Sequence, residues 1–326
     1  MKILTRAHTS QRRLIEILRV IDENDKPIGA RAISDVLSSR GYELGERAVR
    51  YNLKILDELG FTKKHGYSGR VLTQLGINEL KDALVNDRIG FVNTRIEEYM
   101  YRTSFSPELM NGDVIANISL IDKNDSEKAI EAVDRAFEAG YTLCRRMLLF
   151  EGEELPYFSV QEGCLGIATI CSITVDGMFL KRGVPVNTSF AGIIEVKDGE
   201  MNSFSDLVAY AGTSLDPIKV FMSRKMTRVG DAISKGNGKV LANVREVPLA
   251  AEESARKILD QLKEAGIGGT TIIGEQGESL LGCPVSSGKI GIALCAGVNG
   301  VVFAEEMGLR IKTMPISTLI DYRLMK

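Results

Sequence analysis

Seven polar side chains between residues 47 and 70 have the chemistry that nucleic acids require. A guanidinium or an amide can hydrogen-bond a base edge, and a cation can neutralise a phosphate. Four of them recur along a predicted helix that would enter the major groove, and three follow in a predicted hairpin that would hold backbone phosphates. The predicted groove contacts are Arg47, Arg50, Asn52 and Lys54. The predicted phosphate contacts are Lys63, Lys64 and Arg70.

Helices and a hairpin must position these side chains, and the apolar pattern predicts both. Apolar residues recur at helical spacing over 47–59, and Gly60 follows where a helix commonly ends. Residues 61–65 and 70–73 are predicted to be two short strands joined by a glycine-rich turn. A first helix and a short helix over 30–39 precede them. This order is typical of a winged helix-turn-helix that binds double-stranded DNA.

The distribution of charge supports the same interpretation. Residues 1–72 contain 14 Lys and Arg and 9 Asp and Glu, a net charge of +5, whereas the whole chain has a net charge of −2. The remainder is therefore acidic, at −7. A basic head on an acidic body favours DNA docking by the head alone. The alternative is that the cations only solvate a small domain, and their clustering around the 66–69 turn argues against it.

Length and composition describe an ordinary globular protein of two or three domains. The chain has 326 residues, of which 44% are hydrophobic and 26% charged. No apolar run approaches the roughly 20 residues that span a bilayer, and the first residues lack a signal-peptide pattern. We therefore expect a cytoplasmic protein that does not contact membranes, and its five widely spaced cysteines are expected to be reduced thiols. The absence of Trp disfavours stacking on single-stranded bases.

The body of the chain contains an internal duplication. Three short segments recur in the same order after 125 or 126 residues. The pairs are Gly112–Asn117 with Gly238–Asn243, Glu138–Gly140 with Glu264–Gly266, and Gly166–Ala168 with Gly291–Ala293. We infer two copies of one unit, over about 106–205 and 230–326. A pocket for a small ligand is expected where two such copies meet.

Each copy is predicted to contain a strand, an amphipathic helix, two strands, a short helix and a final strand. The predicted strands are 114–120, 146–150, 165–173 and 184–196 in the first copy and 239–244, 270–273, 290–296 and 311–319 in the second, with short helices over 178–182 and 301–307. This order predicts an α/β (α+β) fold. The predicted domains are a winged helix-turn-helix over 1–75, a helical connector over 76–105, and the duplicated effector-binding domain over 106–326. The connector either dimerises or packs on its own body.

Sequence motifs for catalysis are missing. The chain has no P-loop, no dinucleotide-binding G-x-G-x-x-G after a strand, and no G-x-S-x-G elbow. Both histidines, His8 and His65, lie in the head, and the cysteines form no C-x-x-C pair. We therefore expect no enzyme activity, no catalytic residue, no metal and no cofactor. A DNA-tethered enzyme and an interaction or co-repressor subunit without its own sensing remain as alternatives.

Small polar residues of the two copies suggest a binding site for an effector. Hydroxyls and amides hydrogen-bond a ligand, and an arginine can clamp a carboxylate. The predicted effector-binding residues are Thr169, Cys171, Thr174, Arg182, Cys295 and Asn299. The alternative is that the cysteines are small core residues.

The chain resembles the NrpR family of archaeal nitrogen-regulation repressors. The likeness is carried by the head over 33–61 and by the body segments GDVIANISLI, GCLGIATICSITVDG, GVPVNTSFAGIIEV and KIGIALCAGVNGVVFAEEMGLRIKTMPIS. The head is also similar to the winged helix of ribonuclease R. The resemblance implies a dimeric repressor of nitrogen-assimilation genes that binds palindromic operators and is released by 2-oxoglutarate. Some family members carry two body domains, so this chain resembles a split form in which a second NrpR-type subunit supplies the other.

Overall fold

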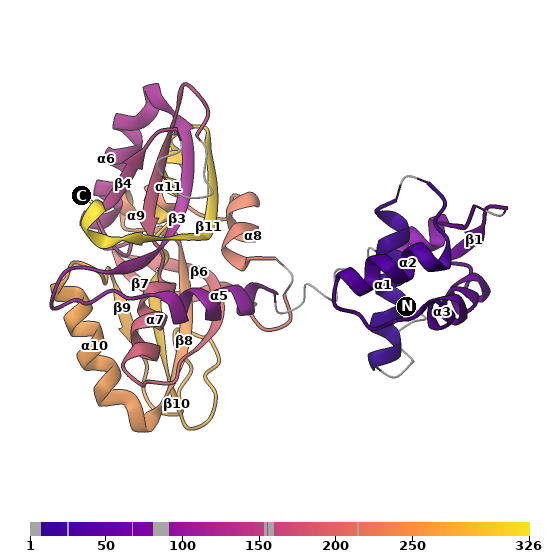
Figure 1. The fold of residues 1–326 in the computed structure, drawn as a ribbon. Coiled ribbons are helices and arrows are strands. Elements are labelled where there is room, and N and C mark those ends of the chain that lie inside the picture. The colour runs from indigo at the N-terminus through magenta and orange to yellow at the C-terminus, as the bar shows by residue number, and fades with distance from the viewer. Residues whose placement is uncertain are drawn as a thin grey trace. The chain divides into compact units, whose positions relative to one another are not determined.

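The computed structural model describes residues 8–24, 26–66, 68–80, 91–152, 155, 160–213 and 215–326. The chain divides into two compact units, Met1–Ile89 and Gly90–Lys326 (Figure 1). The division falls inside the segment 76–105 that we expected to be a connector, of which 81–90 lie outside the described residues. Within the described parts of the chain, no helix is long and apolar enough to cross a membrane.

The first unit has the predicted order of a winged helix-turn-helix. Apolar residues of its three helices fill one core, among them Leu14, Ile33 and Leu53. The Ser34 hydroxyl donates to the carbonyl oxygen of Leu44 at 2.7 Å and fixes the turn before the third helix. The elements are α1 (His8–Asp22), α2 (Ala30–Ser39), α3 (Glu46–Glu58), β1 (Thr62–Lys64) and β2 (Arg70–Leu72), followed by a helical segment described over 74–80.

The wing is held against the rest of the first unit by its backbone. β1 pairs with β2, and Ile28 pairs with Arg70 on the other side of β2 through two hydrogen bonds of 3.0 and 3.1 Å. Gly69 has a φ of +127°, and a Cβ atom there would lie 2.3 Å from the carbonyl oxygen of Ile28. Any other residue at this position would separate the wing from Ile28, so the close approach requires glycine.

The second unit repeats one order of elements twice, which confirms the predicted duplication. The first copy consists of β3 (Asp113–Asp122), a 3-10 turn (Lys123–Asp125), α6 (Ser126–Glu138), β4 (Met147–Phe150), β5 (Cys164–Ile170), α7 (Ile173–Lys181) and β6 (Asn187–Lys197). The second consists of β8 (Gly238–Pro248), a 3-10 turn (Leu249–Ala251), α10 (Glu252–Glu264), β9 (Thr271–Ile273), β10 (Lys289–Cys295), α11 (Asn299–Glu306) and β11 (Ile311–Asp321). Outside the repeat lie α5 (Phe91–Arg102), β7 (Glu200–Ala209), α8 (Pro217–Ser223), α9 (Val229–Lys235) and a last 3-10 turn (Tyr322–Leu324).

The two copies exchange their last strands. β11 of the second copy pairs with β3 of the first, giving the sheet order β11-β3-β5-β4. β6 of the first copy pairs with β8 of the second, giving the order β7-β6-β8-β10-β9. The helices are exchanged in the same way, because α11 packs beside α6 and α7 packs beside α10 (Figure 1). Neither copy completes its own sheet, so the two fold as one unit around an approximate twofold axis.

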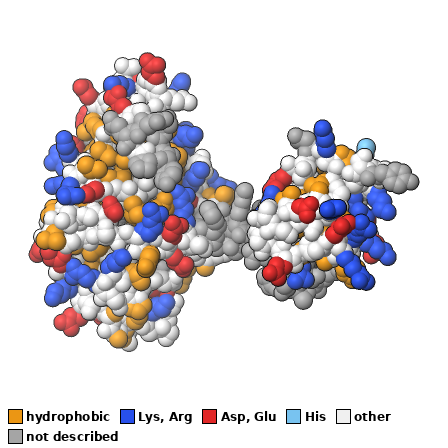
Figure 2. Space-filling model, viewed as in Figure 1, with side chains coloured by type: hydrophobic (Ala, Val, Ile, Leu, Met, Phe, Trp, Pro, Cys, Tyr) orange, Lys and Arg blue, Asp and Glu red, His pale blue; other side chains and the backbone are white. Residues whose placement is uncertain are grey.

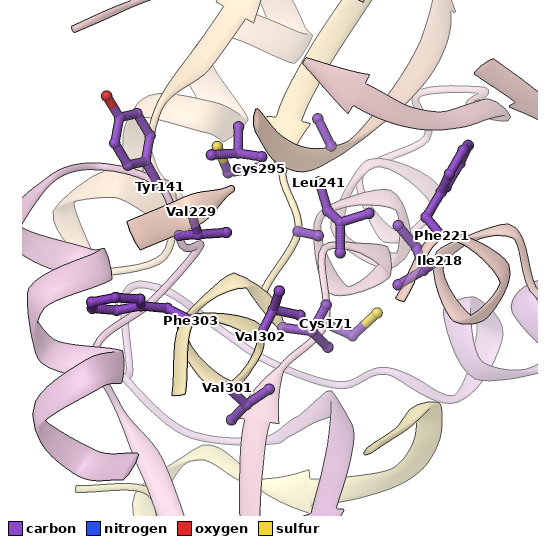
Figure 3. Packing of buried hydrophobic residues seen from close by; sticks show 14 of the residues in the cluster. Tyr141, Cys171, Ile218, Phe221, Val229, Leu241, Cys295, Val301, Val302 and Phe303 are labelled. Carbon is purple, nitrogen blue, oxygen red and sulfur yellow. The ribbon is translucent and has the colours of Figure 1, made fainter. Parts of the chain in front are cut away.

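The largest core cluster is built from both copies. It contains Ile115 of β3, Leu241 of β8 and Val301 of α11. Figure 3 shows Leu241 and Cys295 of the second copy in the same cluster as Cys171 of the first copy, with Ile218 and Phe221 contributed by α8. The hydrophobic stabilisation of each copy therefore depends on the other.

Several predicted boundaries were wrong. The strand predicted over 165–173 ends at Ile170, and the following helix starts at Ile173 instead of 178. The predicted helix 301–307 likewise begins at Asn299. An apolar strand that runs straight into an apolar helix shows no change of residue type at the junction, so the periodicity could not place it. β7, α8 and α9 were not predicted, and α5 packs on α7 of its own unit, which is the second of our two alternatives for the connector.

Candidate nucleic-acid interface and effector pocket

α3 presents a cationic face to solvent. Its apolar residues Val49 and Leu53 are fully buried, whereas Arg47, Arg50 and Lys54 are exposed on the opposite side. Arg50 forms an ion pair with Glu46, one turn earlier in the helix, at 2.5 Å. Figure 2 shows Lys and Arg side chains gathered on the α3 side of the first unit. This face has the charge and the exposure needed to contact DNA phosphates and base edges.

Asn52 does not belong to this face, and its predicted role is wrong. Its side chain is only 8% exposed, and its Nδ2 donates to the carbonyl oxygen of Ala48 at 2.8 Å. At 3.6 residues per turn, position 52 lies with Val49 and Leu53 on the core side. The exposed aromatic residue of the same turn is Tyr51, at 68% exposure, which the sequence reasoning overlooked although it lies one turn after Arg47.

The three predicted phosphate contacts of the wing differ in their surroundings. Lys63 and Lys64 are exposed and available to phosphates. Arg70 is instead tied to Asp57 at the end of α3, with its Nε at 2.9 Å and its Nη2 at 2.8 Å from Oδ2. Thr62 donates to the same carboxylate at 2.6 Å. Asp57 thus fastens both wing strands to the recognition helix, and we correct Arg70 from a phosphate contact to a residue that positions the wing.

Two predicted effector-binding residues are structural equivalents in the two copies. The Thr174 hydroxyl accepts from the backbone N–H of Ile115 at 3.0 Å and donates to its carbonyl oxygen at 3.2 Å. The Asn299 amide bridges the N–H and carbonyl oxygen of Leu241, 126 residues after Ile115, at 3.0 and 2.9 Å. Both side chains are fully buried. They join the start of a helix to the first strand of the same copy, so neither is free for a ligand and both predictions are wrong.

The other four predicted effector residues fall in different places. Cys171 lines a pocket between the copies, and burial raises the pKa of its thiol to about 12. Cys295 is fully buried in β10, and burial raises its pKa further. Thr169 is buried on β5 and is not part of the pocket lining. Arg182 lies at the end of α7 and pairs with Glu108 at 2.5 Å. The structure therefore brings only Cys171 to the pocket.

The pocket lies where the two copies meet. Its lining combines equivalent residues of both copies with part of the α8 region: Asn117, Cys171, Ser172, Ile173, Tyr210, Asp216, Ile218, Asn243, Ala296, Gly297, Val298, Pro315 and Ile316. The segments just before α7 and α11 both contribute, so the N-termini of two helices converge on it. None of the described lining residues is Lys or Arg. The volume that the centre of a water molecule can occupy in the pocket is about 10 Å³. This is room for roughly one water and for no larger ligand.

A polar network surrounds this pocket. The Asn243 Oδ1 accepts from the Ser172 hydroxyl at 2.8 Å, and its Nδ2 donates to the Tyr210 oxygen at 2.7 Å. Its equivalent Asn117 accepts from the N–H of Ile316 at 3.1 Å. Both asparagines end the duplicated six-residue segment, which is the signal that could have led to them. Asp216 accepts from the N–H of Ile218 at 2.8 Å, and burial raises the pKa of its carboxyl group.

A buried ion pair lies directly behind Asn243. Arg245 and Asp176 are both inaccessible to solvent, with Nε 2.6 Å from Oδ1. Arg245 also donates to the carbonyl oxygen of Asn243 at 3.4 Å, and Thr188 donates to Asp176 at 2.7 Å. Such a pair is costly to break, because the remaining charge would be buried alone. It holds α7 of the first copy against β8 of the second.

A wider, open groove lies elsewhere on the second unit. It runs along the start of β11 and the end of β3, has a volume of about 870 Å³, and offers the side chains of Lys225, Arg310 and Lys312. Asp122 and Glu305 lie in the same groove and offset part of its positive charge. The groove has room for a small anion, which the central pocket lacks in this conformation.

Comparison with known proteins identifies the family. Residues 89–326 match the model of the NrpR regulatory domains NRD1 and 2, and residues 15–80 match the ribonuclease R winged-helix domain. The chain belongs to the NrpR family. The global nitrogen regulator NrpRI of Methanosarcina mazei is 51% identical over 97% of this chain and 98% of its own length. The chain is therefore a transcription regulator of a family whose members are named nitrogen regulators, and its winged helix supports DNA binding.

Longer members of the NrpR family and one solved structure are also similar. NrpR of Methanococcus maripaludis is 34% identical over 96% of this chain but only 54% of its own length. NrpR of Methanocaldococcus jannaschii is 33% identical over 95% of this chain and 54% of its own length. The chain therefore spans about half the length of these two relatives. The crystal structure of a nitrogen repressor-like protein from Methanococcus jannaschii covers 72% of this chain and 97% of its own, at 26% identity and a TM-score of 0.61. It supports the fold described above.

Proposed function

We propose that the chain represses nitrogen-assimilation genes by binding a palindromic operator as a homodimer and that 2-oxoglutarate releases it. The observation that carries the sensing part is the pocket where the N-termini of α7 and α11 meet. Helix N-termini favour negative charge because their backbone N–H groups lack partners. 2-Oxoglutarate carries one carboxylate at each end, so each helix would take one.

The size of the pocket suggests how binding is linked to release. In the conformation described here it has room for about one water, so a dicarboxylate requires the two copies to separate slightly. A ligand shifts an equilibrium toward the conformation that it binds more tightly. The open form would then space the two winged helices of the dimer incorrectly for the operator, and the closed form would space them correctly.

The DNA-binding part rests on the exposed faces of α3 and the wing. Arg47, Arg50 and Lys54 would contact the major groove, while Lys63 and Lys64 hold the backbone. A twofold dimer matches a palindromic operator, since each half-site receives one recognition helix. The longer NrpR relatives are nearly twice the length of this chain, which supports a second NrpR-type subunit as a further partner.

A gel shift on a palindromic promoter fragment from a nitrogen-assimilation operon tests the proposal. We expect the purified chain to bind the fragment and millimolar 2-oxoglutarate to abolish binding. Arg50→Ala should lose operator affinity and keep effector binding. Arg256→Ala is the matched control, because Arg256 is an exposed arginine of α10 paired with Glu252 one turn earlier, as Arg50 is with Glu46. Unchanged shifts with Arg50→Ala would refute the assignment of the recognition helix.

Calorimetry distinguishes the central pocket from the open groove. Asp216→Asn removes a carboxylate from the pocket lining, so we expect 2-oxoglutarate to bind roughly tenfold more tightly. Arg310→Gln in the groove should leave the affinity unchanged. The opposite pattern would move the site to the groove. An absence of any heat with the native chain would instead favour a co-repressor subunit that does not sense the effector, and turnover of a substrate would favour a DNA-tethered enzyme.

A further inference from the structure

One aromatic side chain on the cationic face of α3, that of Tyr51, lies outside the core of the first unit. Tyr51 is 68% exposed, and no hydrogen bond of its hydroxyl group is present among the described residues. The apolar residues that fill the core from the same helix, Val49, Leu53 and Leu56, lie on the opposite side. Tyr51 therefore contributes little to folding and presents an apolar ring to solvent.

The neighbours of Tyr51 bring this ring to DNA. Arg47 lies one turn before it and Lys54 nearly one turn after it, and both are exposed. Cations on either side of a ring would be drawn to the phosphates that flank the major groove, and the ring between them would then face the base edges. The apolar feature of the major groove is the 5-methyl group of thymine, which distinguishes thymine from the other bases.

We propose that Tyr51 determines operator specificity by packing its ring against the 5-methyl group of a thymine. This inference rests on the proposed DNA-binding function and assigns one of its contacts. The wing lysines Lys63 and Lys64 supply affinity for any DNA sequence, whereas Tyr51 adds discrimination among sequences to the groove contacts of Arg47 and Lys54. Removing Tyr51 should thus lower the ratio of operator binding to non-specific binding and leave the salt dependence of binding unchanged.

Deoxyuridine scanning of the operator fragment tests the inference. Each thymidine of a half-site is replaced by 2′-deoxyuridine, which lacks only the methyl group, and the affinity of the full chain is measured by fluorescence anisotropy. At one thymine per half-site we expect a loss of about fourfold, from a buried methyl group worth about 0.8 kcal/mol. Tyr51→Ala should bind the normal operator more weakly and show no further loss with deoxyuridine at that position. Tyr51→Phe should keep the sensitivity to deoxyuridine.

The outcomes separate this inference from the proposed function. If no thymine shows a deoxyuridine effect that depends on residue 51, or if Tyr51→Ala binds the operator as the native chain does, Tyr51 does not read DNA and the inference fails. If the native chain does not prefer the operator over random DNA, the proposed function itself fails. Because Tyr51 is exposed, the thermal midpoint of Tyr51→Ala should equal that of the native chain, which checks the fold.

Discussion

Arg70 provides the sharpest test of how the wing is built. Its guanidinium and the Asp57 carboxylate are 17% and 25% exposed and lie 2.8 Å apart, so solvent screens the pair only in part. Hydrogen bonds to charged groups contribute about 1.5–3 kcal/mol each. After a discount for partial exposure we expect a coupling energy of about 1–2 kcal/mol between the two residues. In a winged helix of about 75 residues, that corresponds to a fall of roughly 5–15 °C in the thermal midpoint of the first unit.

Unfolding of Arg70→Ala, Asp57→Ala and the double variant measures this coupling. We expect each single variant to destabilise the first unit and the double variant to cost less than the sum. The salt dependence of DNA binding supplies the second readout. Lys63→Ala, a matched control in the same hairpin, should reduce the slope of log affinity against log salt by about 0.9, the value for one phosphate contact. If Arg70→Ala reduces the slope by the same amount and leaves stability unchanged, Arg70 holds a phosphate and our correction fails.

Three further outcomes follow from the second unit. Burial raises the pKa of Asp216, so the folded state binds its proton more tightly than the unfolded state does. The free energy of unfolding should therefore fall as pH rises from about 4 through the raised pKa. Asp216→Asn should remove this fall in urea-unfolding curves, whereas an unchanged pH profile in the variant would contradict the assignment. Gly297→Ala places a Cβ atom 1.8 Å from the carbonyl oxygen of Ile170, and we expect urea unfolding to show that the free energy of unfolding falls by several kcal/mol. A variant as stable as the native chain would contradict the tight packing of the two copies. Of the five cysteines, Cys164 alone is partly exposed, so a thiol reagent should label it first and reach buried Cys171 only after unfolding; early labelling of Cys171 would mean that the pocket is open in the free protein.

The sequence predicted the elements and the repeat well because local patterns determine them. The helix over 30–39 matches α2, since its apolar spacing and the flanking Gly29 and Gly41 mark both ends. The repeat was visible because short segments stayed nearly identical at one offset. The exchange of β6 and β11 could not be predicted. A buried apolar strand has the same pattern whichever strand it pairs with, so the sequence shows its faces but not its neighbours.

The effector-binding residues were predicted less well, because the same type of polar side chain can bind either a ligand or the protein backbone. Thr174 and Asn299 were chosen as polar residues among apolar ones, yet each satisfies backbone groups of a neighbouring strand. A hydroxyl or amide looks the same in sequence whether it binds a ligand or the backbone. The prediction for Asn52 was wrong for a different reason: adjacent positions of a helix, such as 51 and 52, can lie one on the exposed groove face and the other on the core side. Tyr51 could have been found from its spacing to Arg47.

We propose that operator and 2-oxoglutarate bind to different conformations of the same chain. Isothermal titration of 2-oxoglutarate into the free chain and into the chain saturated with operator tests it most directly. Linkage requires the two ligands to weaken each other by the same factor. We predict that the operator lowers the affinity for 2-oxoglutarate by as much as 2-oxoglutarate lowers the affinity for the operator. Equal affinities of 2-oxoglutarate for the free and the operator-bound chain would show that the two ligands do not select different conformations.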